Sequence, residues 1–237
     1  MSGRRRSMPL VAIALVALAA SACGDDDSTS STGDGTPLAG VLTIEAGQCT
    51  DAAVTAGSSF RMVQPGGTVK DGPFVVNGDS PCGDKTWTPL RPGTDGGLRL
   101  GAYQPQQANP FDATGNAVSK AIAEPQKWFA VAFGLATNER DPQTNKKTRL
   151  PTVVADGEKL SGDLSALAAS WNGQHFNQGA PKPGGSMPGA TSAVTGTYDK
   201  STGAYELTWT SQIVGGPFNN FTGVWRLSGV VNEEDAT

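Results

Sequence analysis

The sequence has one histidine and three cysteines, and this scarcity excludes several kinds of chemistry. A Ser-His-Asp hydrolase would need His175 as its base, but the sequence has no G-x-S-x-G motif to supply the nucleophilic serine, so this class is not indicated. One histidine and two paired cysteines fall short of the three or four ligands that a zinc site needs. The sequence also has neither a phosphate-binding G-x-x-x-x-G-K motif nor a dinucleotide-binding G-x-G-x-x-G motif after a strand. We therefore predict no cofactor, no metal and no catalytic residue.

Two further features are missing, a long apolar run and a basic patch. No run reaches the roughly 20 apolar residues that a transmembrane helix needs. The net charge is −4, and three of the 18 basic residues, Arg4, Arg5 and Arg6, lie in a segment that we expect to be removed. An acidic chain without a basic stripe is a poor ligand for nucleic acid and is not attracted to an anionic membrane surface.

The first 22 residues have the pattern of a signal peptide, with an arginine-bearing start followed by an apolar stretch from Met8 to Ala22. The stretch ends Leu18-Ala-Ala-Ser-Ala-Cys23. Residues 1–23 thus resemble a bacterial lipoprotein precursor, in which small residues precede a cysteine that becomes the lipidated N-terminus. The resemblance implies an exported protein, anchored through lipid on Cys23 to the extracytoplasmic face of the cell membrane. Ala20-Ser21-Ala22 also fits an ordinary A-x-A cleavage site, which would release a soluble protein.

The cysteine count bears on this choice. In an exported protein an odd number of cysteines leaves one thiol free. Lipidation of Cys23 removes that oddness and leaves Cys49 and Cys82 to form a structural disulfide, which suits an oxidising compartment. Residues 24–36 have no large apolar side chain and predict a disordered acidic and Ser/Thr-rich linker. We therefore divide the chain into a signal peptide (1–22), a lipidated cysteine with its linker (23–36) and a β-rich domain (37–237).

The domain is predicted to be all-β, with residues 194–231 as its most informative part. Tyr205, Leu207 and Trp209 alternate with polar residues, and Trp225 lies in a similar alternation further on, as in half-buried strands. The segment Asp199–Gly203 between two of the runs has the composition of a tight turn. We predict a three-stranded meander with Trp209 and Trp225 in the core. The expected fold is a single β-sandwich or β-barrel domain with at most one short helix.

Other segments complete this prediction. The one helix is expected at residues 117–124, between Asn116 as its cap and Pro125 as its stop. Residues 128–135 are almost wholly apolar and predict a strand buried on both faces. Residues 160–176 fit a helix or a strand, and the Asn172-Gly173 dipeptide favours strands joined by a tight turn. The connector 179–189 is expected to be exposed. Further strands are predicted at 38–44, 59–63, 73–77, 86–90 and 98–103.

Three loops begin with an aspartate, at Asp112, Asp141 and Asp199. A calcium loop needs several oxygen-bearing side chains at alternating positions, whereas each of these loops offers one carboxylate. We interpret all three as turns in which the aspartate accepts hydrogen bonds from the following backbone.

The sequence leaves two functional hypotheses. In the first, a membrane-anchored lipoprotein carries a non-catalytic domain that binds a glycan or another envelope component, with Trp171 and His175 as candidate exposed ligand contacts. In the second, a secreted glycan hydrolase uses a carboxylate pair drawn from Asp156, Glu158 and Asp163. Residues 171–229 resemble segments of uncharacterised secreted all-β bacterial proteins, a resemblance that implies no activity.

Overall fold

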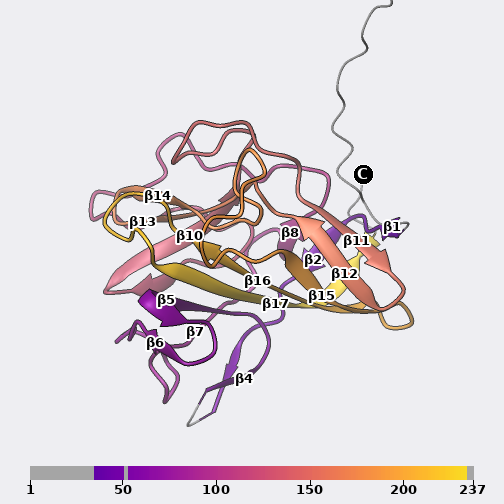
Figure 1. Cartoon of the computed structure of the whole chain (residues 1–237), viewed down its shortest axis with the longest axis horizontal. Coiled ribbons are helices and arrows are strands. Elements are labelled where there is room, and N and C mark those ends of the chain that lie inside the picture. The colour runs from indigo at the N-terminus through magenta and orange to yellow at the C-terminus, as the bar shows by residue number, and fades with distance from the viewer. Residues whose placement is uncertain (1–34, 51–52, 234–237) are drawn as a thin grey trace, which may run out of the picture. The chain divides into compact units, whose positions relative to one another are not determined.

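The computed structural model describes residues 35–50 and 53–233, so the predicted signal peptide, Cys23 and nearly all of the linker lie outside the described residues. The described part forms 17 strands, all paired antiparallel, and no helix (Figure 1). The predicted all-β fold is confirmed. Thr36, which we assigned to the linker, already pairs with Ala155 at the edge of the largest sheet.

The predicted meander is present and forms the centre of the largest sheet. It consists of β15 (Val194–Asp199), β16 (Ala204–Gln212) and β17 (Thr222–Asn232), and Figure 1 shows β16 and β17 side by side. Trp209 and Trp225 are directly opposed across β16 and β17, with stacked rings 5.9 Å apart and almost no exposed surface. The period-2 alternation therefore placed both indoles in the core, as predicted.

The largest sheet has 11 strands and branches at β17, the longest strand. The first half of β17 pairs with β5, and its last residues pair with β2. The order is β1-β11-β12-β15-β16-β17-β2-β8, with β5 also paired to β6 and β7. The remaining strands of this sheet are β1 (Thr36–Pro37), β2 (Val41–Thr43), β5 (Ser59–Thr68), β6 (Gly72–Phe74), β7 (Thr88–Pro89), β8 (Gly97–Arg99), β11 (Thr152–Asp156) and β12 (Lys159–Asp163).

A second sheet of four strands packs against β5 and β17 through aromatic side chains. Its order is β14-β13-β10-β9, and a separate pair is formed by β3 (Gln48–Cys49) and β4 (Val54–Ala56). Phe60 of β5 contacts the rings of Trp128 and Phe133 in the second sheet, at 6.4 and 5.7 Å between centroids. The strands are β9 (Gln126–Trp128), β10 (Val131–Thr137), β13 (Leu167–Trp171) and β14 (Gln174–Asn177).

The buried strand predicted for residues 128–135 is confirmed for residues 131–135, which lie in β10, but it is wrong for residues 128–130. The chain turns back at Phe129 and Ala130, whose φ angles are +51° and +61°, and makes the hairpin β9–β10. Neither residue type favours positive φ. The side chain of Asp79 accepts a 2.6 Å hydrogen bond from the Ala130 amide and thereby holds the turn. This contact comes from a distant part of the chain, so the local sequence gave no sign of it.

The helix predicted at residues 117–124 is also wrong. The backbone of this segment bonds to distant partners instead of to itself. The Ala117 amide donates to Ala132, and the carbonyls of Lys120 and Ile122 accept bonds from Thr94 and Gly93. Ile122 is 1% exposed, and the segment forms part of the core. Tertiary hydrogen bonding has overridden the local helical pattern.

The strand interpretation of residues 160–176 is confirmed. Asn172 and Gly173 have φ angles of +49° and +71° and connect β13 to β14 in a two-residue hairpin. The connector 179–189 is exposed only in its second half, because Gly179, Ala180 and Lys182 are buried. The expectation of an exposed connector is therefore wrong for its first residues.

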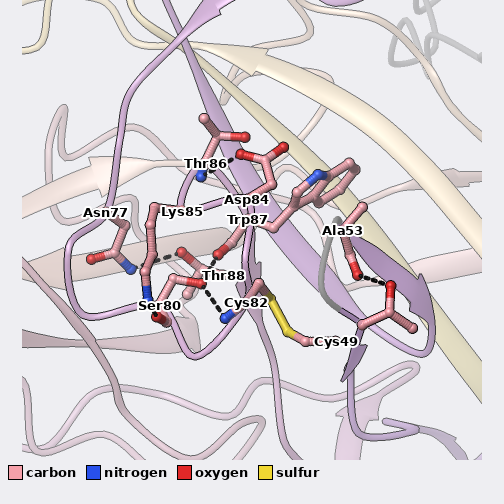
Figure 2. Close-up of a disulfide and its surroundings, with 11 residues drawn as sticks. Cys49, Ala53, Asn77, Ser80, Cys82, Asp84, Lys85, Thr86, Trp87 and Thr88 are labelled. Carbon is pink, nitrogen blue, oxygen red and sulfur yellow. Dashed lines mark hydrogen bonds between the residues drawn. A yellow bond between two sulfur atoms is a disulfide. The ribbon is translucent and has the colours of Figure 1, made fainter.

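The predicted disulfide between Cys49 and Cys82 is formed, with a Cα–Cα distance of 5.0 Å. Figure 2 shows that it joins β3 to a loop tied together by local hydrogen bonds. The Ser80 hydroxyl accepts a bond from the Cys82 amide at 3.1 Å, and Asn77 Nδ2 donates to Thr88 Oγ1 at 3.0 Å. The bond therefore fastens a long strandless segment to the body of the domain.

The three aspartate loops are turns, as predicted. Asp112 and Asp199 each accept a bond from the backbone amide two residues later, at 2.8 Å, and Asp141 accepts one from Thr144, also at 2.8 Å. Hydrogen bonds from Asn116 and Thr114 lower the pKa of Asp112 to about 2. Asp141 differs from the other two because it is buried, at 1% exposure.

Candidate ligand-binding site

A cavity of about 40 Å³ lies between the two main sheets and is walled largely by aromatic rings. Strands β5 and β17 contribute one wall, and β9, β10, β13 and β14 contribute the other. Seven of the 11 lining residues are aromatic. The complete lining is Phe60, Met62, Trp128, Phe133, Ala169, Trp171, Phe176, Gln178, Ile213, Phe218 and Trp225.

The alternation of the strands explains why these side chains converge. Phe60 and Met62 are two residues apart on β5, as are Ala169 and Trp171 on β13, so each pair faces one side of its sheet. The rings then contact one another across the gap. Phe60 and Trp225 lie 4.4 Å apart between centroids, and Trp128 and Trp171 lie 5.4 Å apart.

The polar groups of the cavity wall are occupied by the protein itself. Gln178, the one polar lining residue, accepts a 3.0 Å bond on Oε1 from Trp225 Nε1, and its carbonyl accepts one from Trp209. Trp171 Nε1 donates to the Trp128 carbonyl at 2.7 Å. A ligand in the cavity would therefore meet apolar surface, and a charged group there would lack the partners that burial requires.

Trp171 was predicted as an exposed ligand contact, and the structure places it in the wall of this cavity as a half-buried residue. His175, the other candidate, faces elsewhere. It lines an open groove of about 440 Å³, together with residues of the 142–144 loop and Val214 to Gly216. The two predicted contacts share one hairpin, but the structure does not bring them into one site.

His175 takes part in a hydrogen-bonded group that was not predicted from the sequence. Its Nδ1 lies 2.9 Å from Ser170 Oγ and 3.3 Å from Gln106 Nε2, and its ring lies 5.2 Å from that of Phe111. Burial lowers the pKa of His175. The sequence does indicate the contact between Ser170 and His175. Both residues are equally distant from the Asn172-Gly173 turn, so they pair across the hairpin. Ser170 is 1% exposed and lines neither the cavity nor the groove.

A second missed group surrounds Lys182. Its Nζ donates to the Asn177 carbonyl at 2.8 Å and to Ser211 Oγ at 2.6 Å. Burial lowers the pKa of Lys182 to about 7, against the opposing effect of the Asp141 charge. Lys182 and Ser211 are 7% and 0% exposed, and neither lines the cavity or the groove. The sequence showed only a lysine in a Gly/Pro-rich connector, so nothing local indicated burial.

The carboxylates proposed for a hydrolase line neither the cavity nor the groove. Asp156 and Glu158 lie at the exposed turn between β11 and β12. Asp163 accepts a bond from the Ser165 amide at 2.9 Å and lies 3.9 Å from Arg149.

Within residues 35–50 and 53–233, no three or more His, Cys, Asp and Glu side chains gather as a metal site would require. The same residues contain no helix of the length and apolarity needed to cross a membrane.

No protein-family model, curated protein or solved structure matches this chain. The aromatic cavity is therefore interpreted from its own geometry. Its lining residues can exclude water, contact apolar surface and stack on a ring.

Proposed function

We propose that this protein is an exported lipoprotein, anchored to the membrane through Cys23, whose β domain binds a small apolar ligand without catalysing a reaction. The aromatic cavity carries the binding part of the proposal. Ligand sites are typically concave and apolar with few polar groups. The lining residues are aromatic rings, other apolar side chains and one amide that is already hydrogen-bonded.

The anchoring part is supported by the cysteine arrangement and by the signal-peptide pattern. Cys49 and Cys82 are bonded to each other, which leaves Cys23 as the one cysteine available for another use. Disulfides persist mainly in oxidising compartments outside the cytosol. A diacylglyceryl group on Cys23 would provide the two chains that stable anchoring needs.

Cell fractionation tests the anchor. We expect the wild-type protein to sediment with membranes and the Cys23→Ala variant to appear in the medium. An identical distribution of the two proteins would contradict anchoring and would favour cleavage at Ala20-Ser21-Ala22 with plain secretion.

Calorimetric titration tests binding. The secreted Cys23→Ala protein, which needs no detergent, is titrated with toluene, methylcyclohexane and octanol, and we expect saturable binding of at least one of them. Ala169→Phe adds a ring to the cavity wall and should abolish that binding. Ala204→Phe adds the same ring at an exposed position of β16 and serves as the control. Binding that survives Ala169→Phe, or no binding of any of the three compounds, would refute the proposal.

A further inference from the structure

The loop between β16 and β17 places one ring in the cavity wall. In residues 214–220 every residue is exposed except Phe218, which is half-buried. The Phe218 ring contacts those of Trp128, Trp171 and Phe176 in the second sheet, at 5.5 to 5.8 Å between centroids. It also contacts Phe221, at 5.3 Å. Phe218 thus lies among four rings at the end of an otherwise solvated loop.

The backbone of this loop is bonded mainly to itself. The Phe221 amide donates to Phe218, the Asn219 amide donates to Gly216, and the Gly215 amide donates to the Asn219 side chain. At the base, Ile213 and Phe221 are joined by a 2.8 Å backbone bond. Among the bonds of residues 214–220 that the structure describes, one reaches a distant segment, from Gln143 Nε2 to the Val214 carbonyl. Phe218 can therefore leave the cavity wall once its ring contacts, the Gln143 bond and the local bonds of Asn219 to Gly215 and Gly216 are released.

Gly215 and Gly216 give the loop a suitable hinge. Their φ angles are +84° and +69°, and a Cβ at either position would meet no atom within 4 Å. Glycine has the widest backbone freedom of any residue. The two glycines lie in open surroundings, three and two positions before Phe218. A small rotation of their backbone therefore moves the Phe218 ring a long way.

The cavity as it stands is smaller than an aromatic ring. A cavity of roughly 150 Å³ holds a benzene molecule, whereas this one measures about 40 Å³. If Phe218 left, the volume of its own ring would be added to that space, and the vacated part would have the shape of an aromatic ring. From this geometry we infer that Phe218 occupies a ring-binding site, and that a ligand bearing an uncharged aromatic ring binds there by displacing it. This inference rests on the proposed binding function.

The arrangement of the neighbouring rings specifies the ligand class. Trp171 and Phe176 meet Phe218 nearly edge to face, at interplanar angles of 70° and 78°. Such contacts stabilise an aromatic ring by about 0.5–1.5 kcal/mol beyond what its buried area provides, and a saturated ring does not gain this. The hydrogen-bonded state of Gln178 leaves no partner for a charge. The site therefore favours an uncharged aromatic ring over a saturated ring or a charged one.

The test uses the Cys23→Ala protein, calorimetric titration and hydrogen exchange. Toluene should bind more tightly than methylcyclohexane, by about twofold to tenfold. Phe218→Ala removes the internal competitor and should tighten toluene binding by about tenfold or more, because the free site becomes fully populated. Phe221→Ala deletes a ring that contacts Phe218 but does not line the cavity, so toluene affinity should rise by less than it does in Phe218→Ala. In the protein with Phe218 intact, bound toluene should speed amide exchange in residues 214–221.

Specific results would overturn the inference. Equal toluene affinities with and without Phe218, or slower exchange of the loop in the bound protein, would mean that the ligand enters without displacing the ring. If Phe218→Ala fails to fold, Phe218→Leu should give a smaller gain in affinity, and no gain would count against displacement. Binding that Ala169→Phe blocks but Phe218 does not influence would leave the proposed function standing. No binding by any variant would remove both.

Discussion

At the scale of single residues, Gln178 connects the aromatic core. Its backbone carbonyl and its side-chain Oε1 accept hydrogen bonds from the two stacked indoles, Trp209 and Trp225. Gly223 faces this amide closely, since a Cβ there would lie 2.2 Å from Gln178 Oε1. Two tryptophans can therefore be buried completely because one residue satisfies both of their N–H groups.

Removing this amide should destabilise the domain. Gln178→Leu leaves Trp225 Nε1 buried without an acceptor, so we expect the free energy of unfolding to fall by about 1–3 kcal/mol. Urea denaturation measures the change, and Gln126→Leu at the edge of the second sheet provides a matched control. Equal stability of Gln178→Leu and the wild type would show that the Trp225 N–H finds another partner.

Lys182 gives a second prediction at this scale, on pH. Burial lowers its pKa to about 7 in the folded protein, while the unfolded chain keeps a value near 10.5. Between these values the unfolded chain binds more protons, so stability should rise with pH by about 1.4 kcal/mol per unit at most. We expect Lys182→Met to lose this slope between pH 7.5 and 9.5, and Lys120→Met, at an exposed lysine, to keep it. Parallel slopes for the wild type and Lys182→Met in urea denaturation would contradict the prediction.

At the scale of elements, the β9–β10 hairpin shows a conflict between local preference and tertiary demand. Its turn uses Phe129 and Ala130 at positive φ, where asparagine and glycine are favoured. Trp128 and Phe133 on its two strands both point into the cavity wall, and Phe129 at the turn is 51% exposed. The hairpin thus accepts backbone strain in a turn next to the candidate site, a position where strain is often found in functional proteins.

Ala130→Gly tests this strain. Glycine adopts φ of +61° without the clash that a Cβ causes, so we expect the variant to be more stable by about 1 kcal/mol. Ala132→Gly, on β10 at ordinary φ, should be destabilised instead. Thermal unfolding of the two variants beside the wild type provides the measurement. A lower melting temperature for Ala130→Gly would mean that the turn is not strained.

At the scale of the whole domain, the long irregular segments depend on a few cross-links. The Cys49–Cys82 bond spans 33 positions of sequence and fastens the loop that carries Asn77 and Ser80. Asp79, in the same loop, holds the β9–β10 turn. Loss of the disulfide would therefore loosen the second sheet as well as the loop.

Breaking this disulfide should have a large effect on stability. In the chain-entropy model, closing a loop of this length contributes about 3.5–4 kcal/mol. We expect Cys49→Ser with Cys82→Ser to lower the free energy of unfolding by up to that amount, and reduced wild-type protein to behave in the same way. Coincident urea curves for oxidised and reduced protein would contradict this expectation.

Some features of this protein followed from its sequence alone. Alternation with period 2 in residues 194–231 gave the meander, the inward tryptophans and the all-β class, because the side chains of a strand point to opposite faces regardless of context. The Asn172-Gly173 turn and the three aspartate turns were also predicted correctly, because turn geometry depends on a few adjacent residues. The disulfide followed from the cysteine count together with the lipoprotein resemblance, which implies that Cys23 carries lipid.

Other features were decided only by the tertiary structure. The helix expected at 117–124 became an extended core segment because its backbone bonds to strands far away in sequence. The strand expected at 128–135 begins only at Val131, because the chain makes a turn before it that Asp79 holds. The cavity, the buried Lys182 and the position of Phe218 each depend on side chains from several strands that meet only after the sheets have packed. Local patterns specify which face of a strand is apolar, and long-range contacts determine what that face meets.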